Sequence, residues 1–183
     1  LALVFGQTLS HQEYIAPKFM ELSQKRPKGV LETLCPLVIE ASKGEEGWMQ
    51  WRAYNRHYDG VRCYVKLIQD SLQQLVQQDL PYVENFVVNH LHTVSWLEHE
   101  WILKTLLLLP ERDATLAYQW LMEQFPEHFL DTTSPEERMM TYAAEVLKKF
   151  SPFWSDAQFD QMEQRVVSYH SPDMLENARD RFS

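Results

Sequence analysis

Four cations on one side of a predicted helix are the residues best placed to contact a ligand. From Trp48 to Gln78 the apolar residues recur at steps of three and four, which predicts an amphipathic helix that Gly60 could bend or divide. At about 100° per residue the cations fall opposite the apolar arc. Such a face can contact phosphates or an acidic partner. We call it the basic face; it consists of Arg52, Arg56, Arg62 and Lys66.

Two features of the same segment weaken a role in binding nucleic acid. Asp59 and Asp70 lie on the basic face and dilute its positive potential. The aromatic residues of the segment fall on the apolar arc, where they are poorly placed to stack on bases. Contact with nucleic acid is therefore the alternative, and a solvated helix face is the simpler interpretation. The basic residues Lys25, Arg26 and Lys28 would extend the surface only if they lay nearby.

Trp154 is the second candidate for partner binding. It closes a dense aromatic stretch, residues 150–155, which reads Phe-Ser-Pro-Phe-Trp-Ser and falls in a predicted turn between helices. One interpretation is that the indole packs over a helix end. The other is that it is an exposed anchor for a partner, because Trp is enriched among the residues that dominate binding energy.

The histidines do not form a recognisable metal site or catalytic site. His90 and His92 are two residues apart, so on a helix they lean toward different faces. His99-Glu100 lacks the second His of a zinc-protease helix, since Leu103 occupies that position. A pocket gathering His90, Glu98 and His99 would be the enzyme alternative. Otherwise the sequence predicts no catalytic residue, no metal and no cofactor.

Carboxylate pairs and glycines also fail to indicate an enzyme. Glu136-Glu137 stands at a predicted helix start, where the helix dipole favours negative charge. The chain has only 5 Gly and neither of the common Gly-rich phosphate loops.

Helix boundaries are clearest in the second half of the chain. Asp79 precedes an early Pro, Ser95 and Ser155 open capping boxes, and Pro110 ends a helix. The segment before Pro110 is apolar around most of its girth, which predicts a buried helix. After Ser155 the inward stripe would be Phe159, Met162, Val166 and Val167. The predicted helix starts are Asp79, Ser95, Asp113, Ser134, Ser155 and Ser171.

The fold class that follows is all-α, built of antiparallel helix pairs in an α-solenoid-like or irregular bundle arrangement. With 183 residues, 45% of them hydrophobic, the chain can form a substantial core. We expect a single helical domain over 1–183, a piece of a longer protein. Residues 1–78 are less regular, and residues 79–183 form successive helix pairs.

Charge and cysteine content limit which partners and which cellular compartment the sequence predicts. Residues 1–70 hold 9 basic and 8 acidic side chains, whereas residues 71–183 hold 8 and 18, giving net charges of +1 and −10. An acidic surface disfavours nucleic acid. Cys35 and Cys63 lie in apolar patterns, as buried thiols of a reducing compartment do, which predicts a cytoplasmic protein. No apolar run reaches the length of a membrane span.

The helix spacing after Asp79 resembles an α-solenoid of the HEAT, armadillo or tetratricopeptide type, over about residues 79–182. The resemblance lies in the layout, because the Trp-Leu-Gly-Tyr pattern of tetratricopeptide repeats is absent. The phrases Tyr169–Pro172 and Phe150–Ser155 also resemble helical regions of large bacterial multidomain proteins. The solenoid likeness implies a non-catalytic scaffold that binds another protein or another domain of its own chain.

Overall fold

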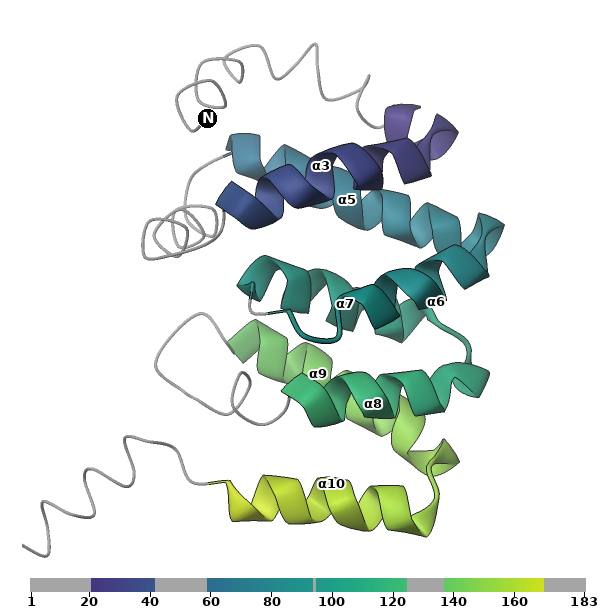
Figure 1. Cartoon of the computed structure of the whole chain (residues 1–183), viewed down its shortest axis with the longest axis vertical. Helices are drawn as coiled ribbons and strands as arrows, with labels where there is room; N and C mark the ends of the chain where they lie inside the picture. The colour runs from purple at the N-terminus through teal and green to yellow at the C-terminus, as the bar shows by residue number, and fades with distance from the viewer. Residues whose placement is uncertain (1–20, 42–58, 94, 125–136, 170–183) are drawn as a thin grey trace, which may run out of the picture. The chain divides into compact units, whose positions relative to one another are not determined.

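The computed structural model describes residues 21–41, 59–93, 95–124 and 137–169, and the regular elements in these ranges are helices (Figure 1). No strand occurs within them, so the all-α prediction is confirmed. None of the helices searched there combines the length and apolarity that a membrane crossing requires. The elements are α3 (Pro27–Ala41), α5 (Asp59–Gln78), α6 (Leu80–Asn89), α7 (Trp96–Leu108), the 3-10 turn η2 (Glu111–Asp113), α8 (Ala114–Gln124), α9 (Glu137–Phe150), the 3-10 turn η3 (Ser151–Phe153) and α10 (Asp156–Ser168).

Packing contacts divide the chain into two compact units, Leu1–Leu108 and Leu109–Ser183. The change of character in the sequence falls earlier, near residue 79. Helices α3, α5, α6 and α7 belong to the first unit, and α8, α9 and α10 belong to the second.

The first unit is built on the packing of α3 against α5, which run side by side (Figure 1). The α5 arc predicted from the sequence is buried at Val65, Ile68 and Leu72. From α3, Leu31, Cys35 and Val38 are buried at steps of four and three, which place them on one helix face. The seam between two amphipathic faces therefore forms the core of this unit.

Helix α3 begins at Pro27, directly after the basic residues Lys25 and Arg26. Pro is suited to the first helical position, because its missing N–H would have no partner there and its fixed φ is helical. Pro36 lies inside the helix, on its exposed side, and the helix continues past it to Ala41.

Helix α6 begins as predicted. Asp79 is its N-cap, and its carboxylate accepts a hydrogen bond from the Tyr82 amide at 3.2 Å. The Lys28 ammonium forms an ion pair with Asp79 and lies 4.9 Å from the centre of the Tyr82 ring. The hydrogen bond from Lys28 lowers the pKa of Asp79 below its usual value, with a smaller contribution from the Tyr82 amide. This cap therefore also joins α6 to the first turn of α3.

Helix α7 is the buried helix that its composition predicted. Trp101, Ile102, Leu103 and Leu106 are at most 1% exposed. The helix starts directly after Ser95 and ends at Leu108, before Pro110, as expected. Side chains on several sides of α7 are therefore buried.

The first helical turn of the second unit differs from the prediction made for Asp113. We expected Asp113 to cap a helix, but it is the last residue of η2, and α8 follows at Ala114. The Asp113 amide donates to the Pro110 carbonyl at 3.0 Å, which closes the 3-10 turn. The Lys149 ammonium of α9 donates to the nearby Leu109 carbonyl, which ties this turn to α9.

Helices α8 and α9 pack against each other. An apolar stripe of α9 is buried at Met139, Ala143, Val146 and Phe150, all at most 1% exposed. On α8 three residues are equally buried: Ala117, Trp120 and Leu121. The predicted starts at Ser134 and Ser171 lie outside the described residues.

A pair of leucines on α7 tests this core. Leu106 is fully buried and Leu108 is 39% exposed. We expect Leu106→Ala to lower the free energy of unfolding by about 2–5 kcal/mol, because it leaves a cavity, and Leu108→Ala by about 1 kcal/mol or less. Urea denaturation followed by circular dichroism measures both. Equal losses would contradict the assignment of α7 as the buried helix.

Candidate functional site

Helix α10 is fixed at its start by the capping box that the sequence predicted. The Ser155 hydroxyl accepts from the Gln158 amide at 3.3 Å, and the Gln158 side-chain oxygen accepts from the Ser155 amide at 3.0 Å. These reciprocal bonds satisfy two backbone donors that a helix start leaves open. The position at which α10 begins is therefore set locally, by its own residues.

Trp154, the residue before this cap, packs over the end of a helix. Its indole N–H donates to the carbonyl of Ala114, the first residue of α8, at 3.0 Å. Its ring meets Tyr118 edge-on, with centroids 5.3 Å apart. The Tyr118 hydroxyl in turn donates to the Gln161 side chain of α10 at 2.6 Å. Trp154 thus anchors α10 to α8, and the remainder of its half-buried side chain faces a groove.

The apolar stripe of α10 is only partly buried, contrary to the prediction. Met162 is 4% exposed, but Phe159 is 50% exposed and Val167 is 73% exposed. The periodicity predicted an apolar face correctly. It was wrong about burial at Phe159 and Val167, since periodicity does not show whether another element covers the face.

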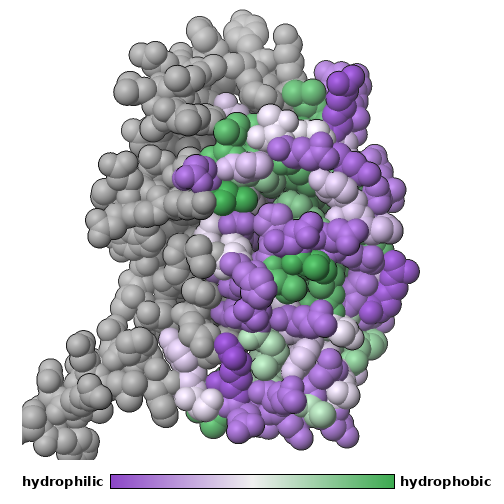
Figure 2. Space-filling model, viewed as in Figure 1, coloured by the Kyte–Doolittle hydropathy of each residue, from purple (hydrophilic) through white to green (hydrophobic). Residues whose placement is uncertain are grey.

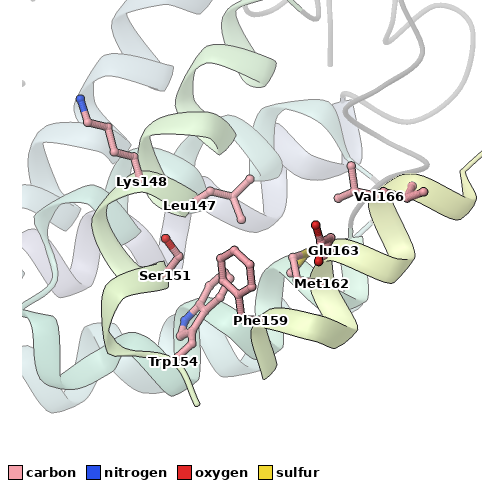
Figure 3. Close-up of a pocket in the computed structure, with 9 residues that line it drawn as sticks. Leu147, Lys148, Ser151, Trp154, Phe159, Met162, Glu163 and Val166 are labelled. Atoms are coloured by element: carbon pink, nitrogen blue, oxygen red, sulfur yellow. The ribbon is translucent and has the colours of Figure 1, made fainter. Parts of the chain in front are cut away.

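The uncovered side of the stripe borders a groove of about 290 Å³ in the second unit. Figure 3 shows the Trp154 and Phe159 rings lying together, with Leu147 of α9 directed toward them and Met162 and Val166 on the α10 side. Figure 2 shows that hydrophobic patches interrupt the hydrophilic surface of the face in view. We call this feature the α10 groove; its lining residues are Leu147, Lys148, Ser151, Trp154, Phe159, Met162, Glu163, Val166 and Val167.

The groove is suited to binding rather than to chemistry. Aliphatic, aromatic and thioether groups make most of its lining, and Lys148 and Glu163 are exposed at its edge. An apolar depression with a charged rim binds an apolar side chain of a partner by excluding water from both surfaces. Trp154 was a site candidate from the sequence, whereas Phe159 and Val167 were not, since periodicity does not reveal whether another helix covers a face.

The basic face is described only in part. Arg52 and Arg56 lie outside the described residues, as does the side chain of Arg62, although its backbone belongs to α5. Lys66 is exposed, and its ammonium lies 2.9 Å from the Asp70 carboxylate one helical turn away. That pair offsets the Lys66 charge, as the presence of Asp70 on this face had indicated.

Two residues of the basic cluster Lys25, Arg26 and Lys28 are also paired with carboxylates. Lys25 pairs with Glu21 across one helical turn, and Lys28 pairs with Asp79. Exposed pairs of this kind contribute about 1 kcal/mol or less, so their main effect here is on local charge.

A second polar cluster lies at the turn between α6 and α7. His90 Nε2 is 3.6 Å from a Glu98 oxygen, and the Thr93 hydroxyl donates to the other Glu98 oxygen. His99 Nε2 is 3.2 Å from the Thr93 carbonyl, and the Ser95 amide donates to the Thr93 hydroxyl at 3.2 Å. The structure therefore brings together His90, Glu98 and His99, as the enzyme alternative required. Thr93 connects them, and no sequence pattern indicated its role.

The geometry of this cluster fits a structural role. His90 Nδ1 is 2.7 Å from the Phe86 carbonyl, and the two rings stack at 4.1 Å. His99 is fully buried. Within the described residues, no group of three metal-ligating side chains is positioned to hold an ion. Most of the cluster's polar atoms are already engaged in holding the turn, so they orient α7 rather than a substrate.

Cys35 lies buried on α3, where the Glu98 charge also acts on it. Burial, with a smaller effect of Glu98, raises the pKa of its thiol from 9.0 to about 12. A nucleophilic cysteine needs a lowered pKa, so this thiol is inert.

No family model, no curated protein and no solved structure matches this chain. The functional assignment therefore depends on the geometry of its own residues.

Replacing Trp154 by Phe tests whether the indole anchors α10. The change removes the N–H that donates to the Ala114 carbonyl while it keeps an aromatic ring. We expect the free energy of unfolding to fall by about 0.5–1.5 kcal/mol and α10 amides to exchange faster. Phe153→Leu, at the exposed neighbouring residue, is the control and should cost less than about 0.5 kcal/mol. Unchanged exchange in Trp154→Phe would contradict the anchor.

The reactivity of Cys35 follows from its raised pKa. In a Cys63→Ser background, thiol modification at pH 8 should be about a thousandfold slower in the folded than in the unfolded chain, because only the thiolate reacts. The rate should rise about tenfold per pH unit up to about pH 11. Rapid modification of folded protein at pH 8 would show that the thiol is not buried as described.

Proposed function

We propose that this chain is a non-catalytic helical module that binds another protein, or another domain of its own chain, through the α10 groove. One observation carries the proposal. Phe159 and Val167 are 50% and 73% exposed on a helix whose intervening residue Met162 is buried. An apolar face that is fixed in place but uncovered is typical of a protein-interaction site.

The way in which α10 is held supports this role. The Ser155 cap and the Trp154 anchor fix the start of the helix, and Phe159 and Val167 remain exposed on it. A preorganised surface binds more tightly, because less conformational entropy is lost when the partner arrives. The likeness to HEAT, armadillo and tetratricopeptide arrays supports the same role and, with it, a scaffold in which α8, α9 and α10 would be one part of a solenoid.

Compartment and the alternative function follow from charge and thiol chemistry. We place the protein in the cytoplasm, since Cys35 is a free thiol, and we favour a bacterial multidomain protein as its setting.

Nucleic-acid binding through the basic face receives less support, because Lys66 is paired with Asp70. Charge reversal at Arg52 and Arg56 that abolished a salt-sensitive shift with DNA or RNA would favour it.

Selection from a displayed peptide library tests the α10 groove, since it lets the surface choose its own ligands. The intact chain should enrich peptides whose apolar residues recur at three- and four-residue steps, since these form one face of a helix. Phe159→Ser/Val167→Ser should reduce enrichment at least about tenfold, because the lost apolar contacts are worth on the order of 1.5–3 kcal/mol each when fully buried.

A matched control uses exposed apolar residues of the first unit. Val88 and Leu108 are 46% and 39% exposed, so Val88→Ser/Leu108→Ser removes comparable surface elsewhere. This variant should retain enrichment. If the two double variants behave alike while both keep the circular dichroism of the intact chain, the α10 groove is not the binding site.

A further inference from the structure

Helix α10 carries a row of exposed acidic side chains, of which one lines the α10 groove. Asp156, Asp160 and Glu163 follow one another at steps of four and three, so they share one face of α10. At about 100° per residue that face overlaps the exposed side of the stripe, where Phe159 and Val167 lie. All three acidic residues are exposed, and Glu163 lines the groove. We call Asp156, Asp160 and Glu163 the acidic row.

Local helix chemistry explains only the first member of the row. Asp156 is in the first turn, where a carboxylate interacts favourably with the helix dipole. Asp160 and Glu163 lie beyond that turn, and like charges four residues apart destabilise a helix slightly. In residues 137–169 no ion pair with another described side chain offsets these carboxylates.

The opposite edge of the groove has a different charge. Lys148 lies in the last turn of α9, is exposed and lines the groove. The groove therefore has an acidic edge on α10, an apolar floor and one cation on the α9 side. The net charge of −10 over residues 71–183 adds a long-range attraction for cations.

We propose that the occupant of the α10 groove is an amphipathic helix of another protein with Lys or Arg along the edge that meets the acidic row. Its apolar residues, at three- and four-residue steps, contact Phe159, Val166 and Val167. Its cations pair with Asp160 and Glu163, and its other edge, facing Lys148, is neutral or acidic. This inference rests on the proposed function, since it specifies the partner of the same groove.

Fluorescence anisotropy with three labelled helical peptides tests the charge of the occupant. The peptides share one apolar face and carry Lys, Gln or Glu on the same edge. With the full chain, the Lys peptide should bind at least about threefold more tightly than the Gln peptide and far more tightly than the Glu peptide. Its affinity should fall as NaCl is raised from about 50 to 500 mM, since salt screens exposed ion pairs.

Two variants of equal charge locate the attraction. Asp160→Asn/Glu163→Gln should weaken the Lys peptide about three- to tenfold and leave the Gln peptide unchanged. Asp156 is retained because it stabilises the start of α10. Glu32→Gln/Glu145→Gln changes the net charge equally at two exposed residues outside the groove and should have less than about a twofold effect.

The outcomes separate this inference from the proposed function. If the Gln and Lys peptides bind equally and both are lost in Phe159→Ser/Val167→Ser, the groove binds a partner but the basic partner is wrong. If the Lys peptide binds and that variant does not weaken it, binding is general charge attraction and the proposed function fails.

Two other occupants would also overturn the inference. Light scattering that detects a dimer of the chain, lost in Phe159→Ser/Val167→Ser, would identify a second copy as the occupant. Peptide binding that appears only in Leu175→Ser/Phe182→Ser would identify the chain's own residues 170–183.

Discussion

The placement of α10 depends on the hydrogen bond that the Trp154 indole donates to the Ala114 carbonyl at 3.0 Å. This bond lies next to the Ser155 cap, so it fixes the point at which α10 starts relative to α8. The contact of Tyr118 with Trp154 and its bond to Gln161 extend the same attachment along the helix. These contacts hold α10 in place, while Phe159 and Val167 on it stay 50% and 73% exposed.

Local interactions were predictable from the sequence, and coverage by other elements was not. The Asp79 and Ser155 caps depend on residues three positions apart, and the structure confirms both. The buried stripe of α9 also agrees with its periodicity. Burial of Phe159 was predicted wrongly, because a repeating apolar pattern shows that a helix has an apolar face but contains no information on what packs against it. The same limit applies to the Thr93 bond with Glu98 and to the ion pair of Lys28 with Asp79, which unite separate segments.

In both units, what a charged residue can bind depends on the residues beside it. The basic face was the strongest sequence-based candidate, yet Lys66 is paired with Asp70 within its own helix. The acidic row is not distinctive as a sequence pattern. In the structure it borders an apolar groove on a helix with two exposed apolar residues. An unmatched charge beside uncovered apolar surface is a stronger indication of a partner than a high local density of charge, since both features gain from the same contact.

Methionine-methyl NMR of the full chain tests the central claim, that α10 presents a binding groove, most directly. Met162 lines the α10 groove, whereas Met139 is buried in the α9 stripe away from it. Titration with the Lys-edged amphipathic peptide should shift the Met162 methyl resonance, assigned with Met162→Leu, and leave that of Met139 in place. A shift of Met139 with an unmoved Met162 would contradict the account.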